Sequence, residues 1–346
     1  MSAIDAGEIS GEMIEGVAQK HVALGVPAAA YGIVGATILE TIKDLLTTDQ
    51  AVLDAWGALY GDISSFFIER EAEIYASVGW QSRRSFRLVN KSLQSDTIAR
   101  LQFCPVDGQP VPSFEAGQFT TVWVKVPGGN GVHGEFNEQP RHYTLAVDKE
   151  NANKTLSISV KRDGLISDIL HKAEIGSEFD LSAPTGCFAL KEPSEVSPRG
   201  PVVFLSAGVG VTPVLAMLEN LSTADCPISW LHGTQNGNQH AYRDRVRHLT
   251  ATKRGDMNCR VWYSNPTEAD GPPGTELESC PSLFNLSKYH YRGRMDLKED
   301  QAKSLLFLDH PEANYYMCGP KGFMEAQTAA LEEAGVDASR IHSEGF

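Results

Sequence analysis

A glycine-rich turn between an apolar segment and a helical segment most constrains what this chain can fold into. The turn, Gly208-Val209-Gly210-Val211-Thr212-Pro213, follows the uncharged residues 201–206 almost directly. Glycines let backbone NH groups approach a phosphate closely, and a helix N-terminus supplies partial positive charge. We expect Thr212 to cap the helix and Pro213 to lie in its first turn. The turn predicts a strand–turn–helix unit that binds a pyrophosphate, and a tight turn without a ligand is the alternative.

Strand-like and helix-like segments alternate around this turn. Apolar runs predict strands at 201–206, 228–232, 260–263 and 313–317, and amphipathic runs predict helices at 212–221, 241–250 and 321–334. This alternation is typical of a doubly wound parallel α/β sheet, whose ligands bind at the carboxyl ends of the strands. We place this domain at residues 198–346, after a polar linker at 192–200.

The middle of the chain carries short strands rich in β-branched and aromatic residues. They lie at 86–89, 99–103, 119–124 and 156–160, and turn signals separate them, including a loop at 127–131. Several short strands with regular turns predict a small antiparallel β-barrel or sandwich. We place this domain at residues 80–192.

A second motif, Arg141-His142-Tyr143-Thr144, lies in this region and precedes the glycine-rich turn by 67 residues. A flavin requires a cation for its pyrophosphate, an aromatic face for its ring and a hydroxyl near the ring nitrogens, which a strand could present. Gly164-Leu165-Ile166-Ser167 resembles a turn into a helix whose NH groups would face the flavin's phosphate. An ordinary solvated edge strand is the alternative for the tetrapeptide on its own.

The third motif, Cys318-Gly319-Pro320, ends a strand-like run at the sheet edge where ligands gather. A buried cysteine is also a common small core residue, and both interpretations stay open for Cys318. The three motifs in this order predict transfer of electrons from a nicotinamide coenzyme to a flavin.

The first part of the chain has helical periodicity. Apolar residues recur at three- and four-residue steps through 14–21, 33–46 and 53–74. Thr47-Thr48-Asp49 marks the start of the third helical segment. Residues 22–39 carry no charge and approach the length of a membrane span, but Pro27, three glycines and Tyr31 lower their hydrophobicity. We expect a buried helix after a corner at Pro27, with a membrane helix as the alternative.

Charge and cysteine usage limit the partners. The net charge is −14, and the first 80 residues hold twelve acids against three bases, so we expect neither nucleic acid nor membrane as partner. Six cysteines occur without a Cys-x-x-Cys pair, which disfavours zinc, iron–sulfur and disulfide-rich scaffolds. With no signal peptide at the start, we expect a cytoplasmic protein.

Residues 80–346 resemble the ferredoxin-NADP reductase family in these motifs. The resemblance implies an FAD-binding barrel followed by an NAD(P)H-binding domain. The flavin contacts that follow from the motifs and the resemblance are Phe119, Arg141, His142, Tyr143, Thr144 and Ser167, and the nicotinamide contacts are Gly208, Val209, Gly210, Val211, Thr212, Pro213, Cys318 and Gly319. The terminal Glu344-Gly345-Phe346 matches a tail whose aromatic residue lies beside the flavin ring until nicotinamide displaces it, which adds Gly345 and Phe346 to the predicted contacts.

Residues 14–76 resemble the second half of the globin domain of flavohaemoproteins, the nitric oxide dioxygenases. The match lies in Val17-Ala18-Gln19-Lys20-His21, Tyr31-Gly32-Ile33-Val34-Gly35 and residues 67–75. It implies that His21 ligates the iron of haem b, that Tyr31 and Glu71 orient the imidazole, and that Lys20 lies near the haem edge. Without the resemblance, His21 is better explained as a surface or core histidine, and Glu71 as one charge of a solvated helix face.

The N-terminus departs from this family. Twenty residues precede His21, where the family's globin has further helices with a distal tyrosine, and residues 1–7 resemble nothing in it. We therefore expect a partial globin at 1–78 and keep two hypotheses. In the first, NAD(P)H reduces FAD, FAD reduces haem, and nitric oxide with oxygen becomes nitrate. In the second, the chain is a haem-free NAD(P)H-dependent flavin reductase. The sequence leaves open the oligomeric state and the choice between NADH and NADPH.

Overall fold

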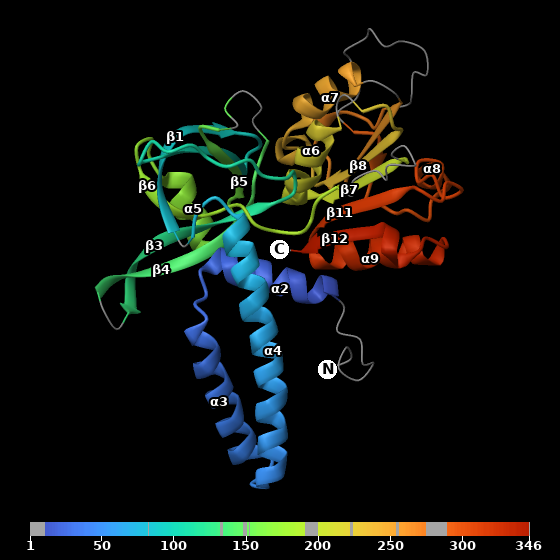
Figure 1. Ribbon diagram of the computed structural model, residues 1–346. Coiled ribbons are helices and arrows are strands. Elements are labelled where there is room, and N and C mark those ends of the chain that lie inside the picture. Colours follow the sequence, from blue (N-terminus) through green and yellow to red (C-terminus); the bar gives the residue numbers. More distant parts are fainter. Residues whose placement is uncertain are drawn as a thin grey trace.

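The computed structural model describes residues 11–81, 83–131, 134–147, 151, 153–190, 200–221, 224–253, 256–274 and 289–345. The chain forms a helical arm, an antiparallel sheet domain and a parallel sheet domain (Figure 1). This order confirms the predicted fold class. The predicted linker at 192–200 lies almost wholly outside the described residues, and the boundaries 1–78, 80–192 and 198–346 stay predictions.

Three helices make the arm: α2 (Gly11–Leu24), α3 (Ala29–Leu45) and α4 (Gln50–Ser77). Gly25 has a φ of +72° and opens the corner that Pro27 continues, so α2 and α3 meet at 118°. Asp49 is the N-cap of α4 and its side chain accepts a hydrogen bond from the Ala51 NH at 2.9 Å, as the start signal predicts. Figure 1 shows α3 and α4 side by side, extending away from both sheet domains.

The arm has a small core. Only Ala18, Val22 and Ile74 form a buried apolar cluster in the described part of the arm. The expectation of a buried helix after Pro27 is wrong in one respect: α3 is present, but Ile33 is 72% exposed and only Gly35 and Ile42 are buried. The reason is that α3 packs against α4 along one side. No single described helix is long and apolar enough to cross a membrane. The helices α2 and α3 reach the length and apolar composition of a membrane span only if they are counted together, and the chain bends between them.

Six antiparallel strands build the middle domain in the order β4-β3-β6-β1-β2-β5. The sheet closes into the predicted barrel, because Leu145 just after β4 bridges to Ile158 of β5, the strand at the opposite edge. The elements are β1 (Arg83–Leu93), β2 (Ile98–Pro105), β3 (Phe119–Gly131), β4 (Gly134–Thr144), β5 (Leu156–Lys161), α5 (Leu165–Lys172) and β6 (Glu178–Ser182). The barrel core includes Phe86, Leu88, Leu101, Phe103, Val122, Val124, Ile158, Val160 and Leu181.

The loop predicted at residues 127–131 is wrong. β3 continues through Gly131, and its pairing with β4 shifts register between Pro127 and Gly131. Glycine and proline residues in a strand often mark such a bulge. The residues that predict a turn therefore form an irregular strand end instead.

The last domain is a parallel sheet in the order β10-β9-β8-β7-β11-β12, covered on both faces. Alternate residues of β7 point to opposite faces: Val202 and Phe204 pack against α6, while Val203 and Leu205 belong to the core that includes residues of α9. The strands are β7 (Val202–Ala207), β8 (Ile228–Thr234), β9 (Met257–Tyr263), β10 (Tyr291–Arg292), β11 (Asn314–Gly319) and β12 (Ile341–Gly345). The helices are α6 (Val211–Asn220), α7 (Arg243–Thr252), α8 (Asp300–Lys303) and α9 (Lys321–Glu333), with 3-10 turns η1 (Gly208–Gly210), η2 (Gly237–Gln239), η3 (Glu268–Asp270) and η4 (Ala338–Arg340).

Hydrogen bonds connect the three parts. Gln19 of α2 accepts a bond at 2.9 Å from the backbone NH of Gly186 in the segment after β6, which links the arm to the barrel. Between the barrel and the parallel sheet, the NH of Asp96 donates to Asn238 O at 3.0 Å, and the hydroxyls of Ser159 and Tyr242 share a short hydrogen bond. The chain's C-terminus lies where all three parts meet (Figure 1).

Candidate functional site

Three side chains from three helices meet inside the arm. Nδ1 of His21 on α2 lies 2.8 Å from the Tyr31 hydroxyl of α3 and 2.8 Å from Oε1 of Glu71 on α4. The Tyr31 hydroxyl also donates a short hydrogen bond to the same carboxylate oxygen. The structure therefore brings together the histidine, tyrosine and glutamate that the sequence singled out, although they are 10 and 50 residues apart from His21 in the chain. We call them the His21 cluster.

The surroundings of the His21 cluster keep the Tyr31 phenol protonated. Glu71 is only 3% exposed. Burial raises the pKa of Tyr31 well above its usual value, and the hydrogen bond to Glu71 raises it further, so the phenol stays neutral and donates. The Tyr60 hydroxyl donates to the Tyr31 carbonyl at 2.7 Å, and the ring of Phe67 lies 6.0 Å from that of His21. These contacts hold the imidazole in one orientation.

The donor set of the His21 cluster suits an axial haem ligand. Haem iron takes one imidazole nitrogen whose other nitrogen is hydrogen-bonded to a carboxylate or carbonyl. In His21, Nδ1 makes the internal bonds, and Nε2 has no partner among the described residues. The side chain is 32% exposed, so Nε2 is accessible. A neutral histidine that donates from Nδ1 to Glu71 keeps its Nε2 lone pair for a metal.

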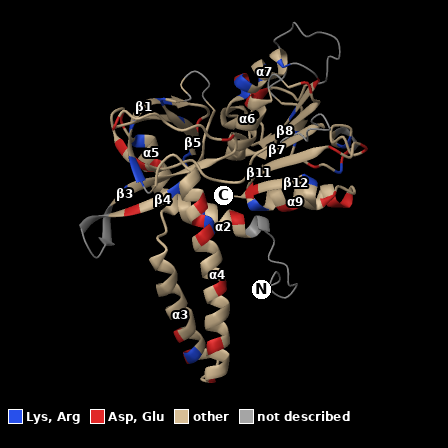
Figure 2. Cartoon of the chain, viewed as in Figure 1, with Lys and Arg blue, Asp and Glu red and all other residues tan. Residues whose placement is uncertain are grey.

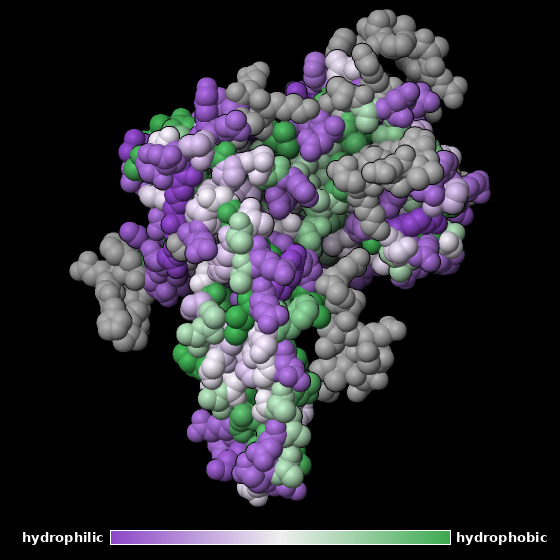
Figure 3. All heavy atoms as spheres, in the orientation of Figure 1, coloured by the Kyte–Doolittle hydropathy of each residue, from purple (hydrophilic) through white to green (hydrophobic). Residues whose placement is uncertain are grey.

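An apolar surface accompanies this ligand. Charged residues of α3 occur only in its C-terminal half, and Figure 2 shows the rest of the helix free of charge. Figure 3 shows hydrophobic residues gathered on the arm. The exposed apolar side chains of α3 and α4 include Ile33, Val34, Ile38, Trp56, Leu59, Ile63 and Phe66. An exposed apolar surface of this kind is typical of a site that binds a large apolar ligand.

The predicted flavin motif lies on β4, paired with β3. Thr144 is opposite Phe119, and His142 is opposite Thr121, whose hydroxyl lies 2.9 Å from His142 Nδ1. The rings of Phe119 and His142 are 4.9 Å apart, and burial, followed by the charges of Lys20 and Arg141, lowers the pKa of His142. The imidazole and the phenyl ring form an aromatic wall where β4 pairs with β3.

The rest of the motif completes this wall. Burial raises the pKa of Tyr143 to about 12, so its hydroxyl is a neutral donor. Thr144 is 6% exposed, while Arg141 is exposed and, among the described residues, its guanidinium donates only to the neighbouring Pro140 carbonyl at 2.7 Å. An exposed cation next to aromatic rings and the buried Thr144 fits the pyrophosphate and ring of a flavin.

The turn at Gly164 also has the predicted form. Gly164 has a φ of +123° and precedes α5. The Ser167 hydroxyl donates to Gly164 O at 2.9 Å and accepts from the Asp163 NH at 2.8 Å. Ser167 therefore shapes the turn, and backbone NH groups at the start of α5 are the donors that remain for a phosphate.

The glycine-rich turn forms η1 and the start of α6. A Cβ on Gly210 would lie 2.1 Å from the Cys318 carbonyl oxygen, so only glycine allows this close approach. The prediction that Thr212 caps the helix is wrong, because Gly210 already has helical dihedral angles and is the N-cap. The Thr212 hydroxyl instead donates back to Val209 O at 3.1 Å. Pro213 lies in the first turn, as predicted.

The Cys318 motif forms the end of β11 beside β12. Cys318 is fully buried, and burial together with the carboxylate of Glu344 raises the pKa of its thiol well above the usual value. Cys318 pairs with Glu344 and Gly319 with Gly345 in the parallel ladder. Burial in turn raises the pKa of Glu344 to about 7. The sequence did not single out Glu344 as a site residue, and Phe346 lies outside the described residues.

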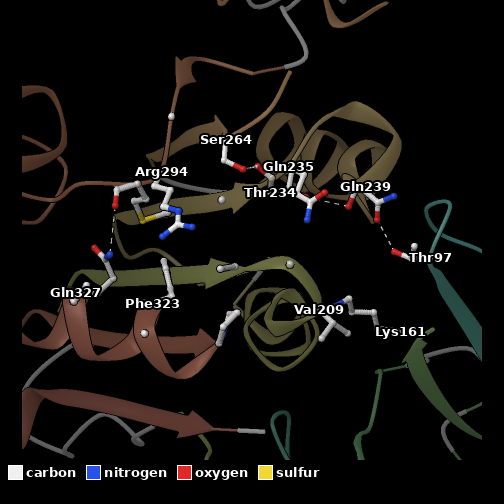
Figure 4. Close-up of a pocket in the computed structure, with 18 of the residues that line it drawn as sticks. Thr97, Lys161, Val209, Thr234, Gln235, Gln239, Ser264, Arg294, Phe323 and Gln327 are labelled. Carbon is white, nitrogen blue, oxygen red and sulfur yellow. Dashed lines mark hydrogen bonds between the residues drawn. The ribbon is translucent and has the colours of Figure 1, made fainter. Parts of the chain in front are cut away.

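A pocket of about 510 Å³ opens beside the glycine-rich turn (Figure 4). Its walls come from the barrel, the ends of β7 and β8, the segment after β10 and α9. Sequence reasoning identified Gly208 and Val209 but missed most of the other polar residues that line the pocket: Thr97, Lys161, Thr234, Gln235, Gln239, Ser264, Arg294 and Gln327. Gln235 and Ser264 follow predicted strands, whereas Gln327 lies within a helix and Arg294 follows β10, which was not predicted.

Comparison with known proteins gives matches along the whole chain. The globin family model matches residues 2–67, and the model of the oxidoreductase NAD-binding domain matches residues 204–279. The flavohemoprotein of Bordetella pertussis is 35% identical over 360 residues, which cover 99% of this chain and 82% of that protein.

Solved structures agree with the sequence matches. The flavohemoglobin of Malassezia yamatoensis with bound FAD and heme has a TM-score of 0.79 at 23% identity and covers 100% of this chain and 82% of that one. The FAD/NAD-binding domain of nitric oxide dioxygenase from Vibrio cholerae has a TM-score of 0.59 at 27% identity, covering 76% and 98%. The globin match corrects one expectation: it begins at residue 2, so the opening does resemble the family, and the globin is present.

Proposed function

This chain belongs to the flavohemoprotein family, and from that premise we propose that it is an NAD(P)H-dependent nitric oxide dioxygenase. In this proposal electrons pass from NAD(P)H through FAD to haem b, and nitric oxide and oxygen become nitrate. The membership rests on 35% identity over 99% of the chain. The scattered cysteines suit a reducing compartment, and we place the reaction in the cytoplasm.

The observation that carries the dioxygenase proposal is the His21 cluster. A reductase that served only soluble acceptors would have no need of a buried carboxylate placed 2.8 Å from an accessible histidine in the arm. The Nδ1–H of His21 donates a hydrogen bond to Oε1 of Glu71, and this bond makes the imidazole a stronger electron donor through Nε2. A more basic axial histidine favours oxygen activation over reversible oxygen storage.

Each cofactor has a set of residues that would hold it. His21 would ligate haem, with Tyr31 and Glu71 as orienting partners. Phe119, Arg141, His142, Tyr143 and Thr144 would contact FAD, and the Gly208–Gly210 turn with Cys318 and Gly319 would contact the nicotinamide coenzyme. When bound, FAD would accept a hydride and release single electrons, and haem would supply the iron at which nitric oxide is oxidised.

The chain's own groups prepare the transfer. Because Gly210 has no Cβ, the turn packs directly against the backbone of Cys318. The backbone NH groups of the turn can then face a pyrophosphate. Partial desolvation, followed by the charges of Lys20 and Arg141, lowers the pKa of His142, which favours the neutral imidazole in the aromatic wall. Lys20 acts on the pKa values of both His142 and Glu344, which places its ammonium between the arm, the barrel and the end of β12.

The second hypothesis is a haem-free NAD(P)H-dependent flavin reductase. The globin match at residues 2–67 and the intact His21 cluster favour the haem-containing protein. The two differ in a simple assay. The purified holoprotein should show a Soret band and consume nitric oxide with NAD(P)H while producing nitrate. A yellow protein that reduces ferricyanide but neither binds haem nor consumes nitric oxide would establish the second hypothesis instead.

A further inference from the structure

Arg294 is a cation in the pocket beside the glycine-rich turn, and no described residue pairs with it. It is exposed, lines the pocket, and makes no ion pair or hydrogen bond with any described residue. We propose that Arg294 binds the 2′-phosphate of NADPH and thereby makes this pocket selective for NADPH over NADH. The inference rests on the proposed function, in which this pocket holds the nicotinamide coenzyme.

The backbone directs Arg294 toward the pocket. β10 ends at Arg292, and Gly293 then takes a φ of +115° while its NH donates to Tyr263 O at 2.9 Å. A residue with a Cβ rarely adopts this conformation, so the turn depends on glycine at this position. Figure 4 shows the Arg294 side chain extending into the pocket, toward the wall on which Phe323 lies.

The neighbouring groups are uncharged donors and acceptors. Gln235 follows β8, Ser264 follows β9 and Arg294 follows β10, so three adjacent strands of the sheet end at this wall of the pocket. The strand ends are tied together, because the Ser264 NH donates to Thr234 O at 2.9 Å and the Asn265 NH donates to Gln235 O at 2.8 Å. In doubly wound folds the adenosine ribose lies near such strand ends.

The charge of the pocket favours a phosphate. Its described lining holds Lys161 and Arg294 and no carboxylate, in a chain whose net charge is −14. Sites that select NADH use an Asp or Glu to bind the 2′- and 3′-hydroxyls, and sites that select NADPH use an arginine. Lys161 is already paired with Asp163 at 2.8 Å and lies beside Val209 of the glycine-rich turn (Figure 4). Arg294 is therefore the cation available away from the pyrophosphate turn.

A guanidinium suits this ligand for geometric reasons. Its fork of NH groups can donate two parallel hydrogen bonds to one phosphate, whereas it finds no comparable acceptor in an unmodified ribose. Because each charge-assisted hydrogen bond adds about 1.5–3 kcal/mol, loss of the guanidinium should weaken binding of the 2′-phosphate roughly tenfold to a hundredfold.

The test compares two ligands that differ only in the 2′-phosphate. Adenosine 2′,5′-bisphosphate and adenosine 5′-monophosphate are titrated calorimetrically into the full-length holoprotein. We expect the bisphosphate to bind at least about tenfold more tightly to the wild type. Arg294→Gln should remove most of this difference and leave the monophosphate unchanged, while Arg294→Lys should retain part of it. Arg292→Ala, which removes an equal charge two residues earlier and outside the pocket, is the matched control.

Equal affinities of the wild type for the two nucleotides would overturn the inference. So would an Arg294→Gln protein that keeps its preference, or an Arg292→Ala protein that loses it to the same extent. Nitric oxide consumption separates this failure from failure of the proposed function. A wild type that consumes nitric oxide equally well with NADH and NADPH contradicts only the role of Arg294, whereas one that consumes none with either coenzyme contradicts the function itself.

Discussion

The helical arm and the two sheet domains bury their apolar side chains to very different extents. Phe86 and Leu101 in the barrel and Phe204 and Leu205 in the parallel sheet are fully buried. The described core of the arm is the small cluster around Ala18, and Ile33 nearby on α3 is 72% exposed. Since apolar surface gains free energy when it leaves water, the arm depends on a bound apolar group far more than the sheet domains do.

The molecule therefore combines a reductase part with its own buried cores and an arm whose stability depends on a bound cofactor. A ligand that binds only the folded arm stabilises it in proportion to the logarithm of its concentration over its Kd. Changes in the arm should therefore affect haem and nitric oxide, and changes in the sheet domains should affect flavin and nicotinamide.

The largest effect is expected from His21→Ala. Removing the axial ligand should abolish haem binding and reduce nitric oxide consumption at least about a hundredfold, because no other described histidine joins the cluster. Ferricyanide reduction by NAD(P)H should change less than about twofold, since the flavin residues lie on other elements. His248→Ala, an exposed position on α7, is the control. Haem retention at the wild-type level in His21→Ala would refute the ligand assignment.

Gly210→Ala should damage the reductase and spare the arm. The added methyl would meet the Cys318 carbonyl carbon at 2.4 Å and its oxygen at 2.1 Å, so the turn or the end of β11 has to move. We expect overpacking to cost about 1–3 kcal/mol of unfolding free energy and to raise the KM for the nicotinamide. Steady-state kinetics with ferricyanide and thermal melts measure both effects. Gly61→Ala, where the structure leaves open space around the new methyl, should leave KM unchanged; a normal KM in Gly210→Ala would count against the turn.

Glu71→Gln should weaken the chemistry at haem without removing it. The amide keeps the shape of the carboxylate but loses the charge that polarises His21 and raises the pKa of Tyr31. We expect nitric oxide consumption to fall about tenfold, with a higher reduction potential of the iron and a lower pKa for Tyr31. Spectroelectrochemistry gives the potential. An unchanged potential would mean that Glu71 serves packing alone.

The smallest effect concerns Glu344 and pH. Burial raises the pKa of this carboxyl from 4.5 to about 7, so the folded protein holds a proton that the unfolded chain has released. Stability contributed by this proton is therefore present at low pH and lost as pH rises from about 4.5 to 7. Glu344→Gln should raise the Tm relative to wild type more at pH 8 than at pH 5. A difference in Tm that is the same at both pH values would contradict the shifted pKa.

Sequence reasoning worked where a repeating pattern reports burial. Alternate residues of β7 face two different cores. Because helices cover both faces of the sheet, the strand is apolar on both sides and gives the continuous run that predicts it. The His21 cluster had no such signal, because three helices bring its members together from distant positions; only the family resemblance singled them out. The arm was predicted as helices, yet the exposure of α3 was missed, since an apolar helix gives the same pattern whether protein or ligand covers it.

The remaining errors concern segments whose structure is set by their neighbours. β12 was predicted only as a tail because its sequence, with His342, Ser343 and Glu344, is polar, and pairing with β11 makes it a strand. Arg294 follows a two-residue strand too short to give a pattern. Thr212 has the chemistry of a cap, but the preceding 3-10 turn starts the helical backbone earlier, at Gly210. Such features depend on neighbouring segments and not on their own sequence.

Electron transfer from the reductase to haem in the arm is tested by anaerobic stopped-flow mixing of the holoprotein with NADPH. Flavin and Soret absorbance are recorded together. If the arm is a haem site supplied by the reductase, flavin absorbance should fall first and the Soret band should then shift to that of ferrous haem. In His21→Ala only the flavin change should remain. Bleaching of the flavin with no Soret band in the wild type, or with a Soret band that never shifts, would contradict the account.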